Sequence, residues 1–334
     1  MSRIMKLLAA VLALSMLASA CGDDDGPAAS GGVPTVVVTT NILGDVVTQL
    51  AGGTVEVVTI MPVGADPHDF QASAQQAAAM RTADVLIVNG GSFEEGLLDV
   101  IEGAESDGVN VYEAMSAVST IEFGENDHDD HDDHDDDGDH DDHDDHDDHS
   151  GHDHSGEDPH FFTDPARMAA AVDGIAAFLI ANVEGIDADI VTEAAEAYHE
   201  DLEALDAEVA ALVAGIPAEN RVLITNHEVF GYFADRYGFE VAGAIIPGGS
   251  TIDGTSAGDL AELAELITDE GVSAIFADVS ASDQLAQTLA DEVGGDIQVV
   301  ELFTESLGDS DSDGATYIDM VRANATRIAE ALAS

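Results

Sequence analysis

Histidine is the residue type whose number and spacing in this chain point most directly to chemistry. Nine of the 13 histidines lie between residues 127 and 154, interleaved with 16 aspartates in repeats of the form HDD. Neutral imidazole donates a lone pair to borderline metals such as zinc, so this tract indicates metal capture rather than a merely acidic loop. It is nearly free of apolar side chains, which predicts a disordered loop over residues 125–157. Its interchangeable ligand sets predict weak accessory sites at His128, His131, His134, His140, His143, His146, His149, His152 and His154.

Three other histidines stand in sharply defined local contexts that predict a separate, tighter site. They are His68 in MPVGADPHDF, His160 in GEDPHFFTDP and His227 in ITNHEVFGYFADRYG. Each follows a predicted strand or opens a predicted helix, and Asp-Pro directly precedes the first two. Because proline restrains the backbone before it, the next histidine projects from a rigid loop end. In open α/β sheets, ligands bind beyond the carboxyl ends of the strands, where such loops lie.

The elements that must position these histidines alternate along the chain. Short β-branched runs alternate with Ala- and Leu-rich helical patterns, which predicts parallel sheets covered by helices. The length suffices for two α/β lobes, which we expect over residues 34–185 and 217–334. The fold class is therefore α/β with two Rossmann-like lobes. The predicted strands cover residues 35–40, 55–60, 84–90 and 109–112 in the first lobe, and 221–226, 239–245, 273–278 and 297–303 in the second.

A long helical pattern lies between the two groups of strands, in the connecting segment 186–216. Its apolar residues recur at steps of three and four and form one stripe, composed of Ile190, Ala194, Tyr198, Leu202, Leu205, Val209 and Leu212. A helix over about residues 188–214 is roughly 40 Å long at 1.5 Å per residue. Such a rigid helix is long enough to join two lobes at a nearly fixed spacing. We expect the metal site in the cleft between them.

The N-terminus has the layout of an export signal. A short basic segment precedes an apolar stretch, residues 7–20, that is too short to cross a membrane as a helix. Residues 1–20 are therefore predicted to be a signal peptide. Cys21, the only cysteine, follows Leu-Ala-Ser-Ala as in a bacterial lipobox, and the alternative is ordinary cleavage beside a stray thiol. We expect a lipid on Cys21, a flexible linker over residues 21–33 and an extracytoplasmic location at the membrane.

The charge of the chain excludes whole classes of partner and mechanism. The formal charge is −61, and it is still −45 when the 16 aspartates of the tract are left out. Nucleic-acid binding depends on neutralising phosphates with cationic side chains, so it is excluded. The only lysine, Lys6, lies in the predicted signal peptide. A lysine Schiff-base mechanism is therefore excluded as well.

Three motifs that would indicate an enzyme or a calcium site are incomplete. The metalloprotease motif HExxH would need its second histidine at Gly231. The G-x-S-x-G pattern around Ser256 has no histidine after it, so Ser256 is instead predicted to cap a helix that begins near Ala257. A calcium loop that begins at Asp309 would need a glutamate where the chain has Met320. The chain is therefore predicted not to be an enzyme.

From about Val33 to the C-terminus, the chain resembles the metal-binding substrate-binding lipoproteins of zinc and manganese ABC transporters. PVGADPHDF, DPHFFTDP and NHEVFGYFADRYG resemble their first three ligand loops, and ELFTESLGDSDSDGATYIDMVRANATRIAEAL resembles the closing ligand segment. The resemblance implies four metal ligands: His68, His160, His227 and Glu305. Family members more often have aspartate at the last position. Asp278 matches a position where they usually have glutamate, which implies a carboxylate that supports a ligand imidazole.

The resemblance also implies what the chain does. Three imidazoles and one carboxylate give a tetrahedral shell that suits Zn²⁺, and a histidine-rich loop before the second ligand loop is typical of zinc importers. The expected function is capture of Zn²⁺ and delivery to an ABC-transporter permease by a monomeric, lipid-anchored protein. Mn²⁺ remains an alternative cargo, although it usually prefers more oxygen ligands. A surface metal store or an adhesin on the same scaffold is the alternative without transport.

Overall fold

The computed structural model describes residues 33–123, 156–252, 254–294 and 297–333. The predicted signal peptide, Cys21 and the nine histidines of the tract lie outside these residues. No helix within the described ranges combines the length and the apolar character that a membrane span needs.

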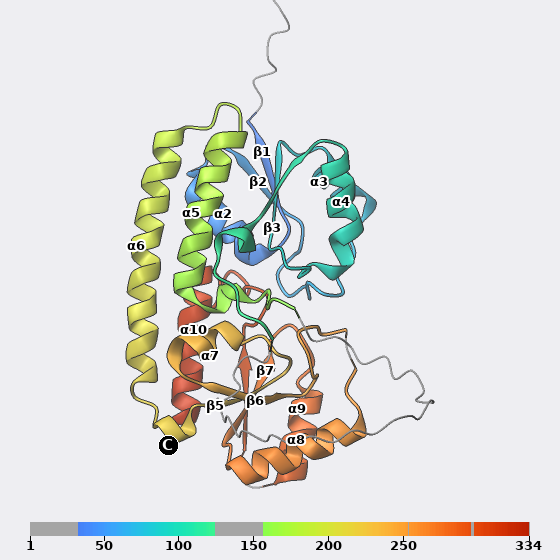
Figure 1. Ribbon diagram of the computed structural model, residues 1–334, viewed down its shortest axis with the longest axis vertical. Coiled ribbons are helices and arrows are strands. Elements are labelled where there is room, and N and C mark those ends of the chain that lie inside the picture. Colours follow the sequence, from blue (N-terminus) through green and yellow to red (C-terminus); the bar gives the residue numbers. More distant parts are fainter. Residues whose placement is uncertain (1–32, 124–155, 253, 295–296, 334) are drawn as a thin grey trace, which may run out of the picture. The chain divides into compact units, whose positions relative to one another are not determined.

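Two parallel four-stranded sheets form the framework and confirm the predicted α/β fold (Figure 1). Their strand orders are β2-β1-β3-β4 and β6-β5-β7-β8, so each lobe repeats the same connectivity. All eight predicted strands are present, each within about two residues of its expected bounds. The strands are β1 (Thr35–Val38), β2 (Glu56–Thr59), β3 (Val85–Val88), β4 (Asn110–Glu113), β5 (Val222–Thr225), β6 (Glu240–Ala244), β7 (Ala274–Asp278) and β8 (Gln298–Leu302).

Helices cover both sheets, and several of them begin at residues whose side chains cap them. Asp164 caps α5 and Pro165 is its first residue, while Ser256 and Asp259 form the capping box of α8, which confirms the cap predicted at Ser256. The helices beside the first sheet are α2 (Asn41–Ala51), α3 (Ala74–Arg81), α4 (Leu98–Ser106) and α5 (Pro165–Asn182). Those beside the second are α7 (Gly231–Tyr237), α8 (Ala257–Glu270), α9 (Gln284–Val293) and α10 (Tyr317–Leu332). Short 3₁₀ turns are η1 (Glu95–Leu97), η2 (Ala114–Ala117), η3 (Phe161–Thr163) and η4 (Ala218–Asn220).

The predicted connecting helix is α6 (Ala188–Val213), which runs beside both lobes (Figure 1). It packs against α2 and α5 at the first lobe and against α10 at the second. Its buried stripe contains Val191 and Ala195 rather than the predicted Ile190 and Ala194, and Ile190 is 40% exposed. Successive steps of four residues rotate about 40° each around a helix of 3.6 residues per turn, so the predicted stripe drifts away from the packed face.

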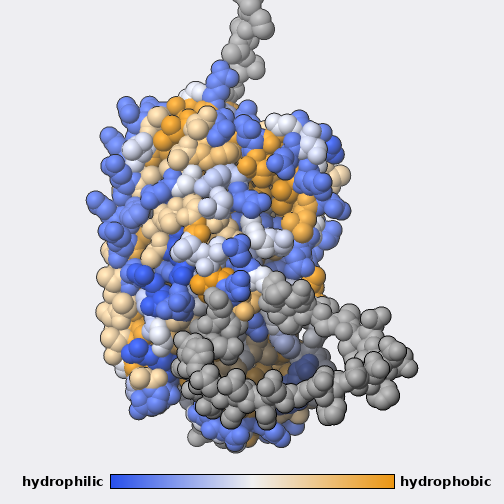
Figure 2. Space-filling model, in the orientation of Figure 1, coloured by the Kyte–Doolittle hydropathy of each residue, from blue (hydrophilic) through white to orange (hydrophobic). Residues whose placement is uncertain are grey.

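The largest core cluster contains residues of both lobes. It includes Val38 of β1, Leu205 of α6, Phe276 of β7 and Ile328 of α10. Because parallel strands are covered on both faces, Val37 packs in a separate cluster under α3 and α4. Hydrophilic residues take up much of the face seen in Figure 2, in keeping with the charge of −61. The shared core connects the lobes on the side of α5, α6 and α10.

Candidate metal centre

Four buried side chains from loops at the carboxyl ends of the strands meet in one cluster. His68 lies between β2 and α3, His160 directly precedes η3, His227 follows β5 and Glu305 follows β8. None of them is more than 3% exposed. One candidate ligand atom from each lies within 4.8 Å of the others. The structure thus brings together all four residues that the sequence resemblance implied as metal ligands.

The three imidazoles converge on a single carboxylate oxygen. Oε1 of Glu305 lies 2.7 Å from Nε2 of His68, 3.3 Å from Nε2 of His160 and 3.2 Å from Nε2 of His227. The other oxygen, Oε2, has no hydrogen-bond partner among the described residues. A buried anion surrounded by three imidazole nitrogens is stable only when cationic charge lies among them. Protons on the imidazoles or a metal ion can supply that charge.

Two of the imidazoles are oriented by further carboxylates. Nδ1 of His68 lies 3.0 Å from Oε1 of Glu95, and Nδ1 of His160 lies 2.7 Å from Oδ1 of Asp158. An ionised carboxylate can only accept, so each Nδ1 carries the proton and donates it. In the neutral ring the lone pair then lies on Nε2 and points into the cluster. This is the tautomer that ligation of a metal through Nε2 needs.

The electrostatic balance of the cluster favours cations. Burial alone lowers the pKa of His68, but the charge of Glu305 and hydrogen bonds with Glu305 and Glu95 outweigh it and raise that pKa to about 10. The pKa of His160 is also raised, because Asp158 and Glu305 outweigh its burial. Burial raises the pKa of Glu305, yet His227 and His68 bring it well below its ordinary value. A metal ion entering the cluster must therefore displace protons.

Aspartates two residues before His68 and His160 fix the backbone at both histidines. Oδ1 of Asp66 accepts the backbone N–H of His68 at 2.9 Å, and Oδ1 of Asp158 accepts that of His160 at 2.9 Å. From the sequence, only the proline of each Asp-Pro-His segment was predicted to position the histidine, and no role was predicted for the aspartate. The aspartate two residues before His160 was the signal that could have identified its ring partner, Asp158. Glu95 carried no comparable signal, because it lies 27 residues from the histidine that it orients.

Asp278 differs from the expectation that it supports a ligand imidazole. It is 3% exposed, and its carboxylate accepts the backbone N–H of Ser280 at 2.8 Å and the hydroxyl of Ser280 at 2.7 Å. The turn after β7 directs the carboxylate to these donors. Burial, followed by the charge of Glu305, raises the pKa of Asp278. Within the described residues, Asp278 is not a member of the four-residue cluster.

The segment from His227 to Tyr232 packs closely around Asp158. The hydroxyl of Tyr232 donates to the backbone carbonyl of Asp158 at 2.6 Å. A Cβ atom on Gly231 would lie 2.5 Å from Oδ2 of Asp158, closer than such atoms can approach. Only glycine fits at the start of α7 while Asp158 keeps this position. The segment carrying His227 is therefore shaped around the carboxylate that orients His160.

The donor set suits one divalent cation. Three neutral imidazoles and one carboxylate offer three nitrogen ligands, one oxygen ligand and a single negative charge. Zinc commonly takes such four-coordinate shells of nitrogen and oxygen. Manganese usually prefers more oxygen, which Oε2 of Glu305 can add.

Comparisons with known proteins agree with this assignment. The family model for the periplasmic zinc-uptake complex component A (ZnuA) matches residues 36–331. The chain is 31% identical over 337 residues to the zinc-binding protein TroA of Treponema pallidum, covering 98% of both chains. It is 28% identical over 332 residues to the manganese-binding lipoprotein MntA of Bacillus subtilis, again covering 98% of both. The solved structure of the periplasmic zinc-binding protein TroA superposes with a TM-score of 0.77 at 29% identity, over 91% of this chain and 100% of that one.

These matches extend over nearly the whole chain and include the fold and the loops that carry the cluster. The family is named for a component of a zinc-uptake complex, and both relatives are named for binding a metal. Their names include both zinc and manganese as the bound metal. The chain therefore belongs to the ZnuA family of metal-binding substrate-binding proteins of ABC transporters.

Proposed function

We propose that this protein captures Zn²⁺ outside the cytoplasm and delivers it to the permease of an ABC importer. The convergence of three imidazole Nε2 atoms on one buried carboxylate oxygen carries this proposal. His68, His160, His227 and Glu305 are the proposed ligands. The nitrogen-rich donor set supports zinc over manganese, because manganese prefers oxygen-rich sites. TroA, one of the similar proteins, is named for zinc binding.

The remaining parts of the chain fit this role. We propose cleavage after residue 20, lipid attachment at Cys21 and a linker over residues 21–33 that tethers a monomer to the membrane. Residues 34–185 and 217–334 act as the two lobes, and residues 186–216 connect them. The nine histidines between residues 128 and 154 form weak accessory sites that concentrate zinc near the cluster. Asp278 acts indirectly, because it hydrogen-bonds Ser280 in the turn after β7 and is not a member of the cluster.

Native mass spectrometry combined with chelator competition tests the location of the site. The mature chain should bind several zinc ions, only one of which resists a chelator of moderate affinity. Deleting residues 127–154 should lower the total stoichiometry and leave that one tightly bound ion. Loss of the tight ion on this deletion would place the main site in the tract instead of the cluster.

Metal identity and transport need separate measurements. Protein isolated from its native membrane in metal-free buffers should contain zinc, whereas manganese in the cluster would establish the alternative cargo that MntA suggests. Cells without the protein should grow poorly only when zinc is scarce. Normal growth in scarce zinc, together with loss of surface-bound zinc, would indicate a metal store.

A further inference from the structure

One loop of the second lobe contacts the surroundings of all three histidines. It comprises residues 246–252, between β6 and α8, and is called the 246–252 loop below. The carbonyl of Gly248 accepts the backbone N–H of Glu228, next to His227, at 3.0 Å. Gly249 lies so close to Phe123 that a Cβ atom there would collide with the ring. The ring of Phe123 in turn lies 6.2 Å from the ring of His160, measured between centroids.

The contact of this loop with His68 passes through a single carboxylate. The hydroxyl of Thr251 donates to Oδ2 of Asp66 at 2.5 Å, across 185 residues of sequence. The other oxygen of Asp66 accepts the backbone N–H of His68 at 2.9 Å. Asp66 therefore connects the second lobe to a proposed ligand of the first. Ser250 adds a side-chain hydrogen bond to Glu95, the carboxylate that orients the ring of His68.

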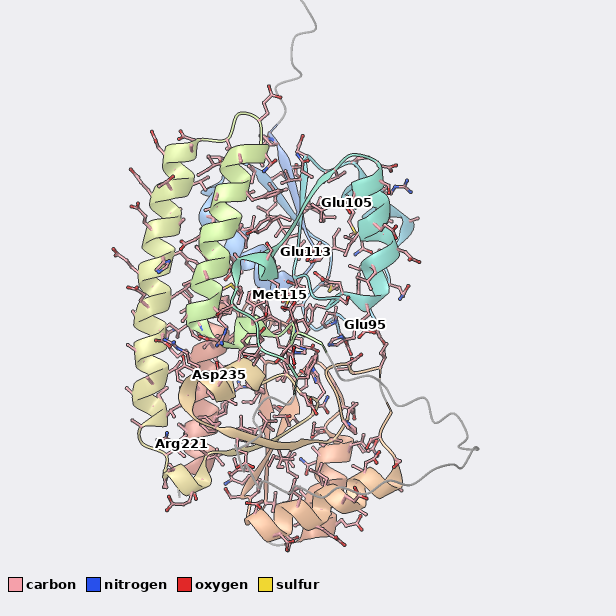
Figure 3. All side chains as sticks on the ribbon, viewed as in Figure 1. Glu95, Glu105, Glu113, Met115, Arg221 and Asp235 are labelled. Carbon is pink, nitrogen blue, oxygen red and sulfur yellow. The ribbon has the colours of Figure 1, made fainter. Side chains whose placement is uncertain are left out.

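His160 has no comparable dependence on the 246–252 loop. Its backbone N–H and its ring Nδ1 both donate to Asp158, which is 1% exposed and only two residues away. The side chain of Glu95, by contrast, is 33% exposed, at the boundary between the lobes (Figure 3). Of the two histidines that follow Asp-Pro, His68 is thus the one whose partners bond to the 246–252 loop.

The cluster is closed in this structure, because no proposed ligand is more than 3% exposed. A metal ion can leave only when a covering segment moves. We propose that the 246–252 loop controls metal exchange through Thr251 and Asp66, and that His68 is the first ligand to release the metal when this loop moves. Thr251 and Asp66 are positioning residues in this scheme and do not touch the metal. The inference rests on the proposed role of the cluster as the metal site.

Substitution at Thr251 tests the proposal without removing any proposed ligand. Thr251→Val keeps the shape of the side chain and removes the hydroxyl, whereas Thr251→Ser keeps the hydroxyl. Thr288→Val is the matched control, because Thr288 is exposed and its hydroxyl bonds within helix α9, to the carbonyl of Gln284. We expect Thr251→Val to release zinc to an excess of chelator roughly tenfold faster, as expected for loss of a hydrogen bond to a charged group. Thr251→Ser and Thr288→Val should release zinc at the wild-type rate.

A second measurement needs no metal. In the metal-free protein, hydrogen exchange of the backbone amides of residues 62–70 should be faster in Thr251→Val than in wild type or in Thr288→Val. Unchanged exchange in this segment would overturn the proposal, as would a wild-type rate of zinc release from Thr251→Val. Failure of the proposed function would look different, because the wild-type protein itself would then retain no zinc against the chelator.

Discussion

The two Asp-Pro-His segments, residues 66–68 and 158–160, have the same backbone hydrogen bond and different side-chain partners. In both, the aspartate accepts the N–H of the histidine at 2.9 Å. Asp158 also accepts the ring Nδ1 of its own histidine, at 2.7 Å. Asp66 instead accepts the hydroxyl of Thr251 and leaves the ring of His68 to Glu95. One histidine is thus held locally and the other by residues distant in sequence.

The two histidines therefore differ in how far their positions depend on the second lobe. His160 takes both its backbone and its ring hydrogen bond from Asp158, two residues away, so neither bond reaches into the second lobe. His68, which is held through Asp66 from both lobes, should move when the lobes separate. The same tripeptide can therefore hold its histidine through local bonds in one loop and through bonds from the other lobe in another, depending on what its aspartate contacts.

The largest expected effect on zinc affinity comes from Glu305, the carboxylate that His68 and His160 both face. Glu305→Gln removes the charge that balances the metal, so zinc affinity should fall by at least about 100-fold, more than the usual cost of losing an indirect partner. Asp278→Asn should cost less, because Asp278 hydrogen-bonds Ser280. Glu305→Asp should be tolerated. Competition titration of the three variants against a zinc chelator measures these differences. Normal binding by Glu305→Gln with weak binding by Asp278→Asn would exchange the two roles.

The next largest effect on zinc affinity is expected from Asp158 and Glu95, the carboxylates that orient the rings of His160 and His68. Asp158→Asn should weaken zinc binding by about 10–100-fold, because the ring and the backbone of His160 both depend on Asp158. Glu95→Gln should weaken binding less, because the side chain of Glu95 is 33% exposed and water can replace it. Glu105→Gln, on the exposed surface of α4, is a suitable control. A larger loss for Glu95→Gln would show that His68, not His160, is the ligand that fixes affinity.

Acidification should weaken zinc binding already at alkaline pH, above the range in which a free imidazole takes up its proton. Because the pKa of His68 is raised to about 10 in the metal-free protein, zinc must displace its proton at any pH below that value. Affinity should therefore fall as pH falls, by about tenfold per pH unit for each proton displaced. Calorimetry at pH 8 in two buffers of different ionisation enthalpy measures the number of protons released. Binding at pH 8 without proton release would contradict the electrostatic balance described for the cluster.

The smallest expected effect tests whether any disturbance near the 246–252 loop reaches His68. Ser256→Ala removes the cap of α8, which begins just after this loop, and should lower the free energy of unfolding by about 1 kcal/mol. Because Ser256 does not contact Asp66, the rate of zinc release should not change. Thermal unfolding in the presence of chelator and stopped-flow release measure the two quantities. Faster release from Ser256→Ala would show that the loop depends on the helix that follows it.

The sequence was sufficient for the parts of this molecule that depend on local patterns. Bounded β-branched runs predicted all eight strands, and apolar periodicity predicted α6. The four clustered residues came from motif resemblance, with Asp-Pro-His as a local marker for two of them. Glu95 and Thr251 were not predictable, because their contacts join segments 27 and 185 residues apart. Such contacts depend on where loops meet after the lobes are packed.

The close packing of Gly231 against Asp158 limits which residue can occupy position 231. The segment from His227 to Gly231 differs from the hydrolytic motif HExxH only at its last position. A histidine there would place its Cβ 2.5 Å from Oδ2 of Asp158 and displace the carboxylate that orients His160. The substitution that would complete the protease motif would thus damage the binding site in the same step. The identity of residue 231 is thereby tied to the position of Asp158.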